Sequence, residues 1–142
     1  MFGFFKKTKN TIKNIEENTL NNLSFDQKDA ICFVAFQIVI KSNVKIHPKE
    51  QVFIQDLINL LRIDKKPTGE RFFNNPNETT RILNTLDQFQ KNWFVIIMHD
   101  LMTVKGNTVD VDQAGYLLEV FNGIGISNDD YVEIVQFHNN IG

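Results

Sequence analysis

Acidic and amide side chains stand at the start of two segments with helical spacing, and they are the groups best placed to do chemistry. Glu50 belongs to the first segment, and Asp110, Asp112 and Gln113 belong to the second. At the start of a helix such groups accept hydrogen bonds from free backbone N–H groups, each worth about 0.5–2 kcal/mol. The same helix end can also hold a ligand or a partner. We therefore expect caps, with a weak ligand or partner site built on them as the alternative.

The other titratable side chains of interest are three histidines and one cysteine. His47, His99 and His138 have no second ligand at a metal-binding spacing. His99 and Asp100 point about 100° apart on a helix, so they form no dyad by themselves. We expect both on an exposed helix edge, with a polar site between two packed units as the alternative. Cys32 stands between two apolar residues, which predicts a buried thiol that no neighbouring base activates.

The chain lacks the sequence motifs of the common catalytic sites. It has no glycine-rich phosphate loop, no Gly-x-Ser-x-Gly elbow and no His-Glu-x-x-His zinc motif. Its formal net charge of −2 argues against a dedicated nucleic-acid binder, which normally carries a basic stripe. We therefore expect a protein that is not an enzyme, with no cofactor and no nucleic-acid partner.

The N-terminal segment combines aromatic rings with lysines. Phe2, Phe4 and Phe5 come directly before Lys6 and Lys7. Aromatic side chains beside cations can bind an anionic membrane surface, and each lysine contributes about 1 kcal/mol there. A secretory signal has the reverse order and a longer apolar stretch, so none is expected. The segment either contacts a membrane surface or folds its phenylalanines back onto the core.

Length and composition favour one domain with an aromatic core. A chain of 142 residues can bury a core without metal or disulfide support, and 13 phenylalanines supply large apolar rings. No apolar run approaches the roughly 18 residues of a membrane span. A single cysteine forms no internal disulfide, so we expect a cytoplasmic location, with peripheral contact at the inner membrane face as the alternative.

The spacing of apolar residues predicts six or seven helices and no strand. The first helix spans about residues 12–23. Ser24 and Gln27 form a capping-box pattern that opens a helix apolar on most sides, which is expected at the centre of the core. Pro48 suits the first position of the helix that follows, and Glu50 sits where it can reach back as a cap.

The second half begins after residues 64–77, the longest irregular connection, with a short turn around residues 72–73. Asn77 is expected to cap a helix that leads, with or without a break, into the apolar segment 93–102. Asp110 and Gln113 are expected to cap the next helix in the manner of His47 and Glu50, and Gly123 to end it in the left-handed conformation. Ser127 is expected to cap the last helix.

Residues 33–63 and 96–126 align on each other without a gap, at an offset of 63 residues. In each copy an apolar helix runs into a short polar turn, and a second amphipathic helix follows. The alignment predicts a duplicated helical pair. Its matched apolar positions are Phe53, Leu57, Leu61 and Ile63 in the first copy and Tyr116, Val120, Ile124 and Ile126 in the second.

The repeated unit resembles the tellurite-resistance TerB-like domains. In that family an apolar helix, a turn of the form Asp-Gly-x-Ile-x-x-x-Glu and an amphipathic helix with a Leu-Gly-Leu/Ile stop pack as two units around a pseudo-twofold. The units here span about residues 30–63 and 94–126. The resemblance implies an all-α single-domain bundle of six or seven helices and a stress-response role. Residues 1–23 would then form an N-terminal segment and first helix, and residues 24–142 the TerB-like domain.

The turns of this chain depart from the family form. Ser-Asn at 42–43 and Lys-Gly at 105–106 stand in place of Asp-Gly, and Gln113 replaces the second Glu. The resemblance implies divalent-metal binding by acidic turn residues, but a hard ion needs several clustered oxygen ligands. No metal site is therefore carried over, and weak divalent-metal binding is kept as a further alternative. Its weak candidate ligands are Glu50, Asp110 and Asp112.

The leading hypothesis is a non-catalytic, cytoplasmic helical module that binds a protein partner. Its expected contact surface is the groove between the turns at residues 42–50 and 105–113. The second hypothesis is peripheral membrane association through the N-terminal Phe and Lys residues. The candidate partner-binding residues are Asn43, Lys45, His47, Glu50, Asn107, Asp110 and Asp112.

Overall fold

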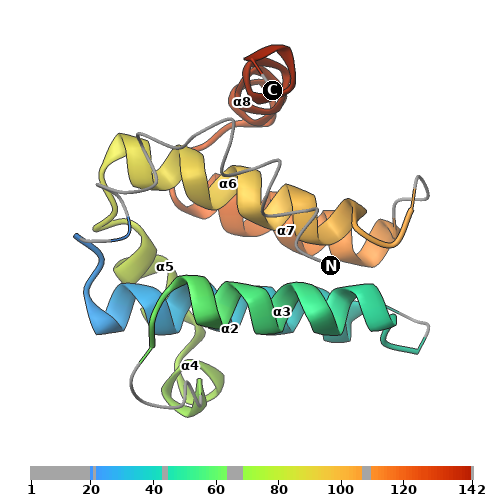
Figure 1. Cartoon of the computed structure of the whole chain (residues 1–142). Coiled ribbons are helices and arrows are strands. Elements are labelled where there is room, and N and C mark those ends of the chain that lie inside the picture. Colours follow the sequence, from blue (N-terminus) through green and yellow to red (C-terminus); the bar gives the residue numbers. More distant parts are fainter. Residues whose placement is uncertain (1–19, 21, 43–44, 64–68, 107–109, 142) are drawn as a thin grey trace.

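The computed structural model describes residues 20, 22–42, 45–63, 69–106 and 110–141, which form seven α-helices and no strand (Figure 1). The predicted all-α class is confirmed. The predicted helix at residues 12–23 lies almost wholly outside the described residues. The helices are α2 (Phe25–Lys41), α3 (Pro48–Leu60), α4 (Glu70–Asn74), α5 (Pro76–Leu83), α6 (Gln88–Thr103), α7 (Val111–Gly123) and α8 (Asn128–Ile141).

Two helical pairs build the centre of the molecule. Figure 1 shows the pair α2 and α3 along one side and the pair α6 and α7 along the other, with α8 viewed end-on beyond α6. Helix α6 begins 63 residues after α2, and α7 begins 63 residues after α3. Helix α2 packs against α3, α5, α6 and α7, so it occupies the predicted central place. The 63-residue repeat in the sequence therefore corresponds to two helices that begin at matching positions.

Side-chain caps fix where several helices begin. Ser24 Oγ accepts the backbone N–H of Gln27 at 3.1 Å, and Gln27 Oε1 accepts that of Ser24 at 2.9 Å, which confirms the predicted capping box. Asp87 and Gln90 form the same pair of bonds at 2.8 Å each at the start of α6. This second box lies 63 residues after the first, so the repeat extends further upstream than the sequence alignment. Ser127 caps α8 as predicted.

Large apolar rings fill the interior, as the composition predicted. Trp93, Phe53 and Phe94 are at most 1% exposed, and Phe94 meets Phe121 edge-on with ring centroids 5.9 Å apart. Phe89, at the start of α6, is exposed despite its apolar ring. No helix in the part of the chain that the structure describes is long and apolar enough to cross a membrane.

The connection between the two pairs contains more helix than expected. Helix α4 lies where only a short turn was predicted, and α5 starts at Pro76 after Asn75. The prediction that Asn77 caps this helix was wrong, because Pro76 takes the first helical position, where its missing N–H costs nothing. The break that the sequence left open is present, since α5 ends at Leu83 and α6 begins at Gln88.

Helix α7 ends at Gly123 as predicted, but the left-handed residue was placed two positions too early. Gly123 is the last residue of the helix, and the left-handed glycine is Gly125, with φ of +83°. The backbone N–H of Ile126 donates to the carbonyl of Phe121 at 2.9 Å across this turn. This bond satisfies a carbonyl at the helix end and requires the left-handed residue at 125 instead of 123.

Candidate functional site

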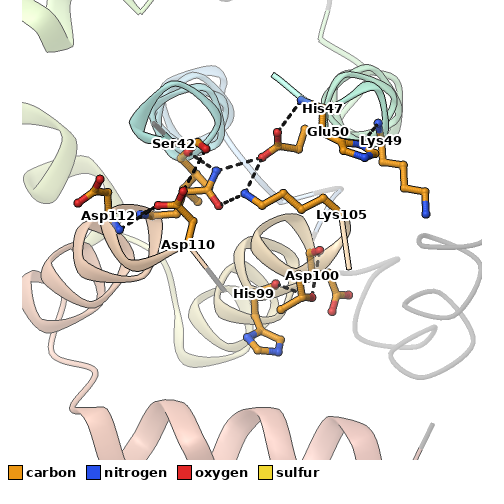
Figure 2. A network of polar contacts seen from close by, with 12 residues as sticks. Ser42, His47, Lys49, Glu50, His99, Asp100, Lys105, Asp110 and Asp112 are labelled. Atoms are coloured by element: carbon orange, nitrogen blue, oxygen red, sulfur yellow. Dashed lines mark hydrogen bonds and ion pairs between the residues drawn. The ribbon is translucent and has the colours of Figure 1, made fainter. Parts of the chain in front are cut away.

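The turns of the two helical pairs meet in a buried polar network between α2, α3 and α7 (Figure 2). Glu50 from α3 is 1% exposed, and Gln113 from α7 is 0% exposed. Gln113 Nε2 donates to Glu50 Oε2 at 3.0 Å. These two residues occupy the same position in the two copies, 63 residues apart. The repeat therefore brings its own equivalent side chains into direct contact.

Lys105, from the second turn, supplies the positive charge of this network. Its Nζ donates to Gln113 Oε1 at 2.5 Å and lies 3.5 Å from Glu50 Oε2, and its side chain is 13% exposed. The other oxygen of Glu50 accepts the backbone N–H of His47 at 2.9 Å. We call Glu50, Lys105 and Gln113 the inter-unit lock, because Glu50 of the first helical pair is bonded to both Lys105 and Gln113 of the second.

Every polar atom at the centre of the inter-unit lock has a partner. Gln113 Nε2 also donates to the carbonyl of Ile38 at 2.9 Å, which ties α7 to α2. A buried carboxylate is costly unless it is paired and hydrogen-bonded, and both conditions hold for Glu50. Removing one partner of a buried ion pair typically costs about 3–5 kcal/mol. The lock is therefore a structural joint whose parts depend on one another.

A second bond between the units lies beside the lock. Ser42 Oγ donates to Asp110 Oδ2 at 3.1 Å, while Asp110 Oδ1 accepts the backbone N–H groups of Asp112 at 2.9 Å and Gln113 at 3.1 Å. These bonds, with that from Gln113 the strongest contribution, lower the pKa of Asp110. Asp110 therefore caps α7 as predicted and also holds α2.

The prediction that α3 and α7 are capped in the same way was confirmed for the first capping residue of each helix and was wrong for Gln113. In α3, His47 Nδ1 accepts the backbone N–H of Lys49 at 3.0 Å and Glu50 reaches back to the N–H of His47, as predicted. In α7, Asp110 caps but the side chain of Gln113 turns inward to the lock. A buried carboxylate and a lysine next to Gln113 offer it stronger bonds than a backbone N–H at the surface.

The predicted partner-binding residues differ in how far they are exposed at this end of the molecule. Lys45 and Asp112 are exposed, and His47 and Asp110 are half-buried. Glu50 lies beneath the surface, so it positions the turns and does not present its carboxylate to a partner. The remaining predicted contacts lie outside the described residues, namely Asn43 and Asn107 in the turns and Phe2, Phe4, Phe5, Lys6 and Lys7 in the N-terminal segment.

His99 and Asp100 are half-buried on α6 and lie away from the lock. Figure 2 shows the ring of His99 pointing away from the lock. Its Nδ1 lies 2.5 Å from the hydroxyl oxygen of Tyr131 on α8. Burial, together with the nearby His138, lowers the pKa of His99. The expectation of an exposed edge was wrong, and the polar contact joins α6 to α8 instead of joining the two repeats.

Cys32 is buried as predicted. It is 1% exposed, and burial raises the pKa of its thiol to about 12. A thiol with this pKa carries almost no thiolate at neutral pH, and the thiolate is the nucleophile. Cys32 therefore packs in the core.

The weak metal candidates do not form a ligand set that fits a divalent ion. No group of three or more His, Cys, Asp or Glu side chains suited to a metal occurs within the described ranges. The ammonium of Lys105 faces the buried oxygen of Glu50, where it would repel a second cation. Asp110 lies in a separate set of bonds with Ser42 and the start of α7.

Sequence reasoning missed Lys105 and Ser42 as members of this site. The signal was present in the repeat, because the 63-residue offset places Ser42 on Lys105 and Glu50 on Gln113. The second copy thus carries a lysine and an amide where the first copy carries a serine and a carboxylate. Opposite charges at two matched pairs of turn positions are consistent with one contact region for the four side chains.

In comparisons with known proteins, no family model, no curated protein and no solved structure matches this chain.

Proposed function

We propose that this chain is a non-catalytic helical module that binds a protein partner at the end where its two turns meet. The observation that carries the proposal is the inter-unit lock, which joins the two turns through buried side chains of both copies. The resemblance to the TerB-like family adds the setting, a stress response such as tellurite resistance in the cytoplasm.

A joined pair of turns is a favourable basis for a contact surface. Side chains that are already held in place lose less freedom on binding, so more of the contact energy appears as affinity. Val111 is 83% exposed and Ile46 is 38% exposed, both at the starts of the helices that follow the turns. Exposed Lys45, Lys49 and Asp112 add charges of both signs. Apolar residues with a polar rim are typical of protein interfaces.

The groups that would be needed for catalysis are engaged in structural contacts. Glu50 is paired with Lys105, His99 lies against the hydroxyl of Tyr131, and the thiol of Cys32 is protonated in the core. None of the three combines exposure with an adjacent base or acid that would activate it. These contacts support the proposal of a binding protein.

A pull-down from the source cells tests the proposal. The bait is the full chain, carrying Val111→Glu in one variant and Lys45→Glu with Lys49→Glu in another. All three positions are exposed, so the fold should be unchanged within about 0.5 kcal/mol. We expect at least one protein, recovered with the native chain, to be lost with both variants when the fractions are compared by quantitative mass spectrometry.

The matched control is Gln136→Glu, which places the same charge at an exposed position on α8. It should recover the partner as well as the native chain does. Equal recovery by the two turn variants and the native chain would contradict binding at the turn end.

A further inference from the structure

A small apolar hollow lies between α2 and α4, on a different part of the surface from the turn end. Its volume is about 180 Å³. Its walls come from Phe33, Phe36 and Ile40 of α2 and from Gly69 and Phe73 around α4, and Asp29 lies at one end. Figure 1 shows α4 on the side of α2 that faces away from α6 and α7. The hollow is thus separate from the inter-unit lock.

Gly69 allows the two sides of the hollow to approach closely. Its φ is +67°, and a Cβ atom there would lie 2.8 Å from Cδ1 of Phe33. Any other residue would be strained and would displace this ring. Phe33 in turn meets the ring of Phe73 edge-on, with centroids 5.2 Å apart. The shape of the hollow is therefore set by packed aromatic rings and by the absence of one side chain.

The rim of the hollow is apolar and open to solvent. Phe36, Ile40 and Phe73 are 38%, 55% and 62% exposed. Large apolar side chains gathered around a depression are typical of a contact site. Pockets for drug-sized ligands measure about 300–1,000 Å³, so this hollow suits a single large side chain of a docked segment.

Asp29 places a buried carboxyl group in the wall of the hollow. It is 6% exposed, and its Oδ1 is buried with no hydrogen-bond partner in the part of the chain that the structure describes. Its Oδ2 lies 3.5 Å from a guanidinium nitrogen of Arg71, which lies closer to Asp26 Oδ1, at 3.1 Å. Burial raises the pKa of Asp29, and the shared Arg71 offsets this only in part.

A buried carboxylate with one unsatisfied oxygen and a shared cation is costly to keep. Asp29 lines the hollow, so a donor on a segment docked there would approach its carboxyl group and offset that cost, and an ionised donor would do so most strongly. We propose that the hollow between α2 and α4 binds a segment of a partner protein in which a large apolar side chain is followed by Lys or Arg. The apolar side chain packs on Phe36, Ile40 and Phe73, and the cation pairs with Asp29.

Two blocked dipeptides test the proposal directly. The probes are acetyl-Leu-Arg-amide and acetyl-Leu-citrulline-amide, which has nearly the same shape without the charge. Backbone amide shifts of the full-length protein are followed by NMR during titration. We expect the arginine probe to shift residues around the hollow and to bind at least tenfold more tightly than the citrulline probe. Equal binding, or shifts elsewhere on the surface, would overturn the proposal.

Matched variants separate the charge from the shape. Asp29→Asn should abolish the preference for arginine, while Asp26→Asn, at the exposed neighbour that also holds Arg71, should retain it. Phe73→Ser, at an exposed rim position, should weaken both probes at least fivefold without unfolding the protein. A preference that survives Asp29→Asn would overturn the role of the carboxylate.

Two other occupants would also overturn the proposal. A concentration-dependent dimer that Phe73→Ser dissociates, measured by analytical ultracentrifugation, would assign the hollow to a second copy of the chain. Tighter dipeptide binding by the full chain with Phe2, Phe4 and Phe5 replaced by serine would assign it to the N-terminal segment. Neither result changes what the pull-down with the turn variants at Val111, Lys45 and Lys49 measures. This proposal and the proposed function can therefore fail separately.

Discussion

At the scale of single residues, the polar groups inside this protein serve as joints between helices. His99 on α6 illustrates this, because its ring is half-buried against the hydroxyl of Tyr131 on α8. Burial and the nearby His138 lower the pKa of His99, and burial and the charge of Asp100 raise the pKa of Tyr131 to about 12. Both shifts favour the neutral forms of the pair. The contact between α6 and α8 therefore depends on pH.

We predict that the stability of the protein decreases in mild acid through His99. The folded state holds this ring neutral, so the unfolded chain takes up its proton first as the pH falls. The stabilisation is complete above the unfolded pKa of about 6.5 and is lost as the pH falls from there through the lowered folded-state pKa. Urea unfolding at pH 7.5 and 5.5 should show this loss in the native chain and a smaller loss in His99→Gln. Identical losses in both would contradict it.

At the scale of elements, the sequence was most informative where a helix begins and the contacts are local. The capping residues Ser24, His47 and Asp110 were predicted because each partner lies within three positions along the chain. Gln113 has the same local pattern, but its side chain is drawn to Glu50, which is distant in sequence and close in space. Capping rules consider only residues close in sequence and therefore do not include Glu50. The lock could not be predicted from these rules alone.

We predict that the two matched capping boxes contribute equally to stability. Ser24→Ala and Asp87→Ala should each lower the free energy of unfolding by about 1 kcal/mol, because each leaves backbone N–H groups at the start of its helix without a side-chain acceptor. Chemical denaturation measures both. Gln136→Ala, at an exposed position inside α8, is the control and should change stability by less than about 0.5 kcal/mol. An unchanged Asp87→Ala protein would argue against the second box.

At the scale of the whole molecule, duplication explains the architecture and divergence explains the site. The apolar pattern and the helix starts recur at the same offset, so the fold class followed from the sequence. The chemistry at the centre does not recur, because Gln113 and Lys105 stand where the first copy has Glu50 and Ser42. Because the two turns carry different side chains, Glu50 of the first copy can bond to Lys105 and Gln113 of the second. The hollow beside Asp29 depends on Gly69, far from Asp29 in sequence, and no local pattern indicates it.

The central claim is that the inter-unit lock joins the two helical pairs, and a double-mutant cycle on Glu50→Gln and Lys105→Met tests it most directly. Lys105→Met leaves a buried carboxylate without its cation and should cost about 3–5 kcal/mol. The double variant removes both charges and should be more stable than the sum of the two losses predicts, with a coupling of about 1–3 kcal/mol by urea unfolding. Losses that add to within about 0.5 kcal/mol would contradict the lock.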